Sequence, residues 1–245
     1  MRTLKLTLAY DGTNYVGWQR QENGLAVQQV LEEALQPMCG DRVPVLMGAG
    51  RTDAGVHATE QVASVRVSFD HAASAVHRAL NVRLPRDIRV LAVEDADPRF
   101  HARFDATGKS YRYRIATDRV PLPFDRWFVW QMAQPCDIDS MRAAAGALLG
   151  RHDFTSFQAR DSAVLDGWRT LERVHVERVG SEIQIEVDGD GFLRHMVRII
   201  VGTLVDIGVG NRAVDSMASA LAARDRQAAG RTAPAQGLTL VKIRY

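Results

Sequence analysis

Apolar residues recur at strand-like spacing in some segments of the chain and at helix-like spacing in others. The order of these segments is the feature that most constrains the fold. Leu4, Leu6 and Leu8 alternate with other residues, as on a β-strand with one face in a core. The apolar spacing that follows predicts in turn a helix, two strands, a helix and a strand, over 27–38, 43–47, 61–69, 75–80 and 88–94. Asp70 is placed to cap the second helix. This β-α-β-β-α-β order is the ferredoxin-like, or split βαβ, arrangement, with both helices on one face of an antiparallel sheet.

The second half of the chain repeats this order with one added helix. We expect strands over Lys109–Thr117, Leu171–Arg178, Glu182–Asp188 and Leu238–Tyr245, and helices over Asp139–Leu149, Gly191–Gly208 and Val214–Ala223. A polar connection follows residue 97, so the two halves are predicted to cover 1–104 and 105–245. The predicted fold is α+β, with two ferredoxin-like halves joined into a wide antiparallel sheet that has a central cleft.

A glycine-rich stretch, Gly48 to Ala58, lies between two of the predicted strands and carries Arg51 and Asp53. It is too rich in glycine to be helix or strand, so we expect a loop that presents Asp53. Its glycines permit positive φ and let another molecule approach closely. The ordinary alternative is a tight connection in which Asp53 caps a neighbouring backbone N–H, as aspartate often does in turns.

This stretch resembles the signature of the TruA family of tRNA pseudouridine synthases, in which the aspartate is catalytic. The resemblance spans nearly the whole chain through further segments in the family's order and spacing: Asp11–Tyr15, Gly17–Gln19, Lys109–Tyr113 and Gly191–Arg198. It implies an isomerase that converts uridine to pseudouridine at positions 38, 39 and 40 of the tRNA anticodon arm. It also implies an active site in the central cleft, and a homodimer whose two chains share one tRNA.

Pseudouridine formation breaks the bond between uracil N1 and ribose C1′, turns the base and rejoins it through C5. The reaction is redox-neutral, so no cofactor is expected. As in glycoside cleavage, charge develops on the sugar, and a carboxylate captures or stabilises it. Asp53 is the candidate, and three routes stay open: addition to C1′, removal of a ribose proton to give a glycal, or attack on the base. Burial alone would raise the pKa of this carboxyl, so a nearby cation is needed.

Two further site residues match positions of the family, and a third follows from its place in the loop. The resemblance makes Arg198 the ionic partner of Asp53 and Tyr111 the residue that contacts the flipped base, and Arg51 is placed to hold the flipped nucleotide or its phosphate. From the residues alone, Tyr111 also fits a core position. Arg194 and Arg198 share one side of the predicted helix, so both also fit a solvated surface, and the role of Arg194 stays open.

Some other residues leave alternatives open. Tyr15 and Trp18 suit either stacking on bases or anchoring a loop. His57 and Glu60 have a spacing seen in metal sites, but no second pair accompanies them, so no metal is assigned.

Composition says more about the compartment in which the protein works than about its function. The net charge of +2 says little about partners. Only three of the 31 basic residues are lysines, and we favour a GC-rich genome over phosphate binding as the reason for that skew. Cys39 and Cys136 lie in no paired motif, which fits a reducing cytoplasm, and no membrane segment is expected. Two other classes stay open: a non-catalytic RNA-binding module, and a nucleoside hydrolase that uses a carboxylate on C1′.

Overall fold

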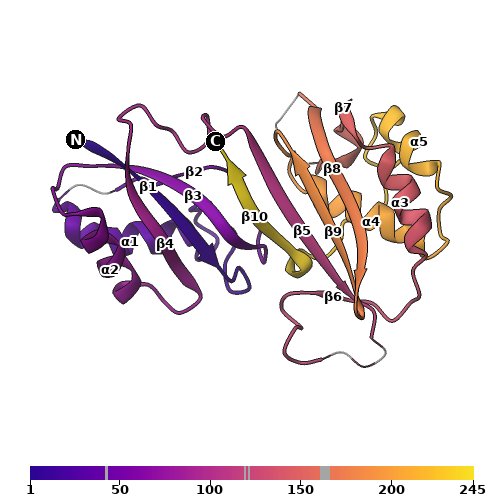
Figure 1. Cartoon of the computed structure of the whole chain (residues 1–245), viewed down its shortest axis with the longest axis horizontal. Helices are drawn as coiled ribbons and strands as arrows, with labels where there is room; N and C mark the ends of the chain where they lie inside the picture. The colour runs from indigo at the N-terminus through magenta and orange to yellow at the C-terminus, as the bar shows by residue number, and fades with distance from the viewer. Residues whose placement is uncertain (42–43, 119, 121, 161–165) are drawn as a thin grey trace. The chain divides into compact units, whose positions relative to one another are not determined.

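The computed structural model describes residues 1–41, 44–118, 120, 122–160 and 166–245, which form two compact units (Figure 1). The first unit holds Met1–Thr107 and Thr239–Tyr245, and the second holds Gly108–Leu238. The predicted α+β class is confirmed, with helices packed on mostly antiparallel strands. Nearly all of the last strand, which we expected in the second half, groups with the first unit. None of the helices described is long and apolar enough to cross a membrane.

The first unit has the strand order of a ferredoxin-like fold. β1 (Arg2–Tyr10) lies between β4 (Ile88–Ala96) and β3 (His57–Val67) and is antiparallel to both. Two short partners share the other edge of β3: β2 (Met47–Gly48) is antiparallel to it, and β10 (Leu238–Arg244) is parallel to it at the end near the Asp53 loop. The start of β3 is therefore paired on both sides, which stabilises the strand that leaves this loop.

Two helices cover the apolar side of these strands. α1 (Val27–Cys39), with Gly40 at its C-cap, packs beside α2 (Ala73–Arg83), which also contacts β4 (Figure 1). Leu4, Leu6 and Leu8 are at most 1% exposed, so the alternation predicted for β1 is confirmed.

Two local predictions in this unit are wrong. A buried strand over 43–47 does not form: Val43 is outside the described residues, Val45 is 60% exposed, and only the short β2 remains. Asp70 does not cap α2, because that helix begins three residues later, after Ala72, without a side-chain cap.

The strands of the second unit follow the order β5, β9, β8 and β7. β5 (Gly108–Ala116), β9 (Glu182–Gly189) and β8 (Trp168–Val179) are antiparallel neighbours, and β7 (Gly150–Asp153) adds to the far side of β8. A two-residue strand, β6 (Trp130–Gln131), runs parallel to the end of β5. Neither β6 nor β7 was predicted, because both are too short to show a period.

Three helices complete the second unit: α3 (Ile138–Gly146), α4 (Met196–Gly208) and α5 (Ser216–Ala223). α3 is capped by Asp137, whose carboxylate accepts two backbone N–H bonds, and α4 is buried along almost its whole length. The helix predicted from Gly191 is wrong in its start. His195 takes a left-handed conformation with a φ of 62°, so the regular turns begin only at Met196.

Candidate active site

Backbone hydrogen bonds fix the path of the loop that carries Asp53. The N–H of Ala49 donates to the carbonyl of Val62 in β3, at 2.8 Å. Further along, the N–H of Val56 turns back to the carbonyl of Asp53 itself, at 3.1 Å. An isolated antiparallel bridge also joins Asp53 to Gly17. The catalytic candidate therefore sits on a constrained loop rather than on a free one.

A second loop, from Asp11 to Trp18, packs against this one. The N–H of Trp18 donates to the carbonyl of Thr52 at 3.1 Å. Gly17 has a φ of 108°, and a Cβ at that position would lie 2.4 Å from the Thr52 carbonyl oxygen. Only glycine allows both this conformation and this close approach. The Asp-Gly-Thr and Gly-Trp-Gln motifs therefore support the Asp53 loop.

The aromatic residues of the second loop are anchors. Tyr15 is 5% exposed and its hydroxyl donates to Asp87 at 2.8 Å, while its carbonyl accepts the N–H of Gly55 at 3.3 Å. Trp18 is 1% exposed and packs against Tyr10 with ring centroids 6.2 Å apart. Of the two alternatives for these residues, the structure favours loop anchoring over base stacking.

Exposure alternates along the loop around Asp53. Thr52 is 7% exposed and its hydroxyl lies 2.8 Å from that of Tyr10 in the interior. Its two neighbours are more accessible, since Arg51 is exposed and Asp53 is partly exposed. The loop therefore combines one buried residue with two accessible charged residues beside it.

His57 belongs to the framework of this loop. It is 3% exposed, its Nδ1 accepts the N–H of Gly12 at 3.0 Å, and the same atom lies 3.1 Å from an oxygen of Asp11. Within the described part of the chain, no three His, Cys, Asp or Glu residues are grouped to hold a metal ion.

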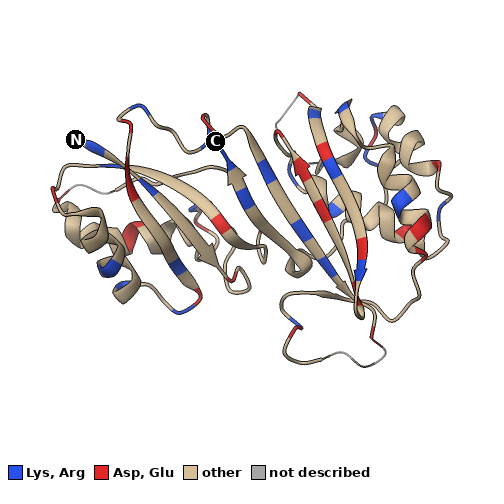
Figure 2. Ribbon diagram, viewed as in Figure 1, with Lys and Arg blue, Asp and Glu red and all other residues tan. Residues whose placement is uncertain are grey.

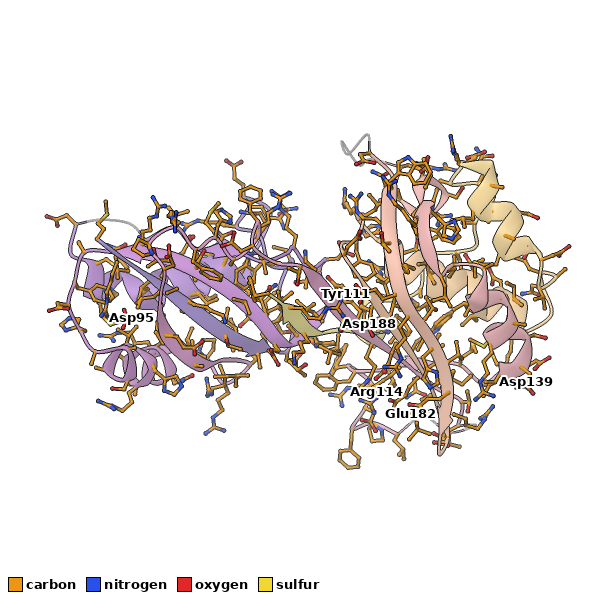
Figure 3. The ribbon with its side chains drawn as sticks, turned by 45° about the horizontal axis from the view of Figure 1, so that its top comes forward. Asp95, Tyr111, Arg114, Asp139, Glu182 and Asp188 are labelled. Carbon is orange, nitrogen blue, oxygen red and sulfur yellow. The ribbon has the colours of Figure 1, made fainter. Side chains whose placement is uncertain are left out.

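In the second unit, Tyr111 lies on β5 and is 8% exposed (Figure 3). Its ring meets that of Phe192 edge to face, with centroids 5.0 Å apart and planes at 80°. Tyr113, on the same face, is fully buried and donates its hydroxyl to the Pro234 carbonyl at 2.7 Å. Burial raises the pKa of the Tyr113 phenol above its ordinary value, and the charge of Arg198 acts in the opposite direction.

The arginines that alternate with these tyrosines lie on the other face of the strand. Arg112 pairs with Glu186 at 2.9 Å, and Arg114 pairs with Glu182 at 2.5 Å. Figure 2 shows only basic residues on β5, only acidic residues on β9, and residues of both signs on β8. These two arginines are therefore paired with acidic residues of a neighbouring strand.

Arg198 lies in the first turn of α4 and is only partly exposed. Its Nε donates to the carbonyl of Ala233 at 2.8 Å, and its own carbonyl accepts the N–H of Ala233 at 3.0 Å. These two bonds hold the arginine in place. Arg194 is exposed and precedes the helix, so the prediction that the two arginines share a helix side is wrong.

Tyr10, Gln61 and Phe192 were not predicted as functional residues. Each carries a signal in hindsight. Tyr10 directly precedes the Asp-Gly-Thr motif, Gln61 is a polar residue at a buried position of β3, and Phe192 lies inside the motif that ends at Arg198.

Comparison with known proteins places the chain among RNA-modifying enzymes. A family model described as tRNA pseudouridine synthase matches residues 7–105 and 144–245. Proteins named tRNA pseudouridine synthase A from Pelobacter propionicus and Acidiphilium cryptum are each 47% identical over all of this chain, and over 100% and 97% of their own lengths. The protein of that name from Paramagnetospirillum magneticum is 46% identical, over 96% of its length. A chain in a solved Cbf5-Nop10-Gar1 complex aligns with 97% of this chain at a TM-score of 0.42 and 11% identity, and this chain spans about half (48%) of it.

Proposed function

The chain belongs to the tRNA pseudouridine synthase family, and we propose that it isomerises uridine to pseudouridine at positions 38, 39 and 40 of the tRNA anticodon stem-loop. The proposal depends on one observation: Asp53 is partly exposed on a constrained loop, while Thr52, the residue before it, is buried. A partly exposed aspartate on such a loop is suited to meet the sugar of a nucleotide that has left its stack.

We assign the chemical step to Asp53. The glycosidic bond between N1 and C1′ breaks, a bond between C5 and C1′ forms, C5 loses its proton and N1 regains one, so the product has the composition of the substrate. Asp53 acts on the ribose, either by bonding to C1′ or by removing a ribose proton, since charge develops there. The balance of this reaction needs no oxidant, reductant or cofactor.

Arg51, Tyr111 and Arg198 are proposed to act on the same nucleotide. Arg51 is exposed on the loop of Asp53, which suits a contact with the flipped nucleotide or its phosphate. Tyr111 has a flat ring fixed by Phe192, which suits contact with an extruded base. Arg198 is held by Ala233 and is proposed as the ionic partner of Asp53.

We also propose that the enzyme works in the cytoplasm as a homodimer whose two chains share one tRNA. The cytoplasm is supported by the cysteines, because Cys39 and Cys136 are both free thiols. Recognition of the tRNA by shape and phosphate contacts follows from RNA geometry, since the major groove of A-form RNA is closed to side chains.

The test is incubation of the protein with unmodified tRNA, followed by chemical mapping of pseudouridine and by chromatography for free uracil. We expect pseudouridine at positions 38 to 40, RNA of unchanged length and no free uracil. Free uracil without pseudouridine would identify a nucleoside hydrolase. Tight tRNA binding with neither product would identify an RNA-binding module.

Variants at Tyr111 and Arg198 test the assigned roles. Tyr111→Phe keeps the flat ring and Tyr111→Leu removes it, so the phenylalanine variant should retain far more activity than the leucine variant. Arg198→Lys keeps the charge but loses the planar fork that bonds to Ala233, so its turnover should fall. Equal activity of the two Tyr111 variants would reject base contact by the ring.

A further inference from the structure

Three polar side chains lie buried directly behind the loop that carries Asp53. Tyr10, Thr52 and Gln61 are 4%, 7% and 0% exposed. The hydroxyl groups of Tyr10 and Thr52 are 2.8 Å apart. The amide nitrogen of Gln61 donates to the carbonyl of Gly50 at 2.9 Å and lies 3.5 Å from the Tyr10 hydroxyl. We call these three residues the inner network.

Burying the inner network costs free energy, and packing the space behind the loop does not by itself require polar groups. Each buried hydroxyl or amide loses its hydration, and its hydrogen bonds recover only part of that free energy. Apolar residues of similar shape would fill the same space without this cost. Hydrogen bonds add direction, which dispersion contacts lack, so a satisfied polar network fixes one conformation of the segment it holds.

The network remains in one protonation state at neutral pH. Burial raises the pKa of the Tyr10 phenol to about 12, while its hydrogen bonds to Thr52 and Gln61 lower it by less. The phenol is therefore neutral around pH 7 and keeps both its proton and its acceptor lone pairs. The bond between Tyr10 and Thr52 does not change over the range in which most enzymes work.

The contacts of the network fall on both sides of Arg51 and directly before Asp53. Gln61 holds the carbonyl of Gly50, and Tyr10 holds the side chain of Thr52, which stands between Arg51 and Asp53. Thr52 is held inward, while its neighbours Arg51 and Asp53 are the more exposed residues. A movement of Thr52 would shift the backbone that carries both neighbours.

We propose that Tyr10, Thr52 and Gln61 are positioning residues that set the direction of Arg51 and Asp53 for the isomerisation, a role that rests on the proposed function. They touch no substrate and act only through the loop. Displacement of a reacting group by about 1 Å can cost on the order of 100-fold in rate. Loss of the network should therefore lower kcat by about 10- to 100-fold, a larger factor than any rise in KM for tRNA.

The test uses the full chain and unmodified tRNA, with kcat and KM for pseudouridine formation and the melting temperature as readouts. Tyr10→Phe and Thr52→Val each remove one hydroxyl from the network, and the double variant removes both. Thr52→Ser restores the hydroxyl. Tyr245→Phe is the matched control, because it removes a tyrosine hydroxyl that donates to the Ala102 carbonyl at 2.9 Å in the same unit but contacts no residue of the inner network.

We expect both single variants to lose kcat, the double variant to be no worse than the more affected single one, and Thr52→Ser to return to within about threefold of the wild type. Tyr245→Phe should keep the wild-type kcat. Wild-type kcat in Tyr10→Phe or Thr52→Val would overturn the proposal. A loss of kcat/KM that comes from KM alone, or a loss of activity that matches the fraction of unfolded protein, would overturn it as well. If Tyr10→Phe does not fold, Thr52→Val against Thr52→Ser decides by the same criteria. If the wild type makes no pseudouridine, the proposed function fails instead.

Discussion

Gly17→Ala should destabilise the protein through the contact between the two loops. Gly17 has a φ of 108°, and an added Cβ would lie 2.4 Å from the Thr52 carbonyl oxygen and 3.1 Å from the carbonyl carbon of Asp53. Ordinary van der Waals contact needs at least 3.4 Å, so the backbone that carries Asp53 must move by about 1 Å. That movement breaks the bond from the Trp18 N–H to the Thr52 carbonyl.

The expected loss combines three effects. The positive φ costs an alanine about 1–2 kcal/mol. The lost backbone hydrogen bond costs about 0.5–1.5 kcal/mol. Alanine lowers the entropy of the unfolded chain, which stabilises the folded state by about 0.4–1 kcal/mol. The free energy of unfolding should therefore fall by about 2 kcal/mol, which corresponds to a melting temperature lower by about 4–8 °C in a chain of this size.

Two other glycines separate these effects in the same assay, thermal unfolding followed by circular dichroism. Gly180 has a φ of 61° with nothing near its Cβ position, so Gly180→Ala measures the backbone cost alone. Gly146 has neither constraint, so Gly146→Ala should be neutral or slightly stabilising. The reasoning is refuted if Gly17→Ala lowers the melting temperature no more than Gly180→Ala does.

Two further predictions concern pH and the charged strand face. The pKa of Tyr10 is raised to about 12 in the folded chain, above an unfolded value of about 10, so its contribution to stability is complete below pH 10 and is lost as pH rises toward 12. Urea unfolding across this range should show the decline, and Tyr10→Phe should make it shallower; an identical decline in the variant would contradict the assignment. Glu186→Gln weakens ion pairs with Arg112 and Arg173, whose side chains are 43% and 50% exposed, so urea unfolding should show a loss below about 1 kcal/mol. A loss of several kcal/mol would show that these pairs are not screened by solvent.

The fold was predictable where apolar periodicity is long. β1 and β5 alternate over nine residues each, and α4 is a long apolar run, so their types were clear from the sequence. β6 and β7, of two and four residues, show no period, and their pairing depends on tertiary neighbours. The start of α4 was misplaced because nothing in the sequence shows that His195 adopts positive φ, which interrupts the predicted helix.

The candidate site was predictable only in part, for a different physical reason. A carboxylate in a glycine-rich loop is visible as a motif, so Asp53 and Arg51 were selected directly. The support beneath them was not predictable, since Tyr10 and Gln61 come together only after β1 and β3 pair. Tyr15 and Trp18 were ambiguous for a similar reason, because burial, which separates an anchor from a stacking surface, is a property of the folded chain.

The central claim is that the carboxylate of Asp53 carries the chemistry, and single-turnover conversion of tRNA by Asp53→Asn tests it most directly. Asparagine keeps the shape of the side chain but can neither bond to C1′ as a carboxylate nor accept a ribose proton. With enzyme in excess over tRNA, we expect Asp53→Asn to form no pseudouridine above background, while its tRNA binding stays near the wild-type level. Pseudouridine formation by Asp53→Asn at the wild-type rate would contradict it.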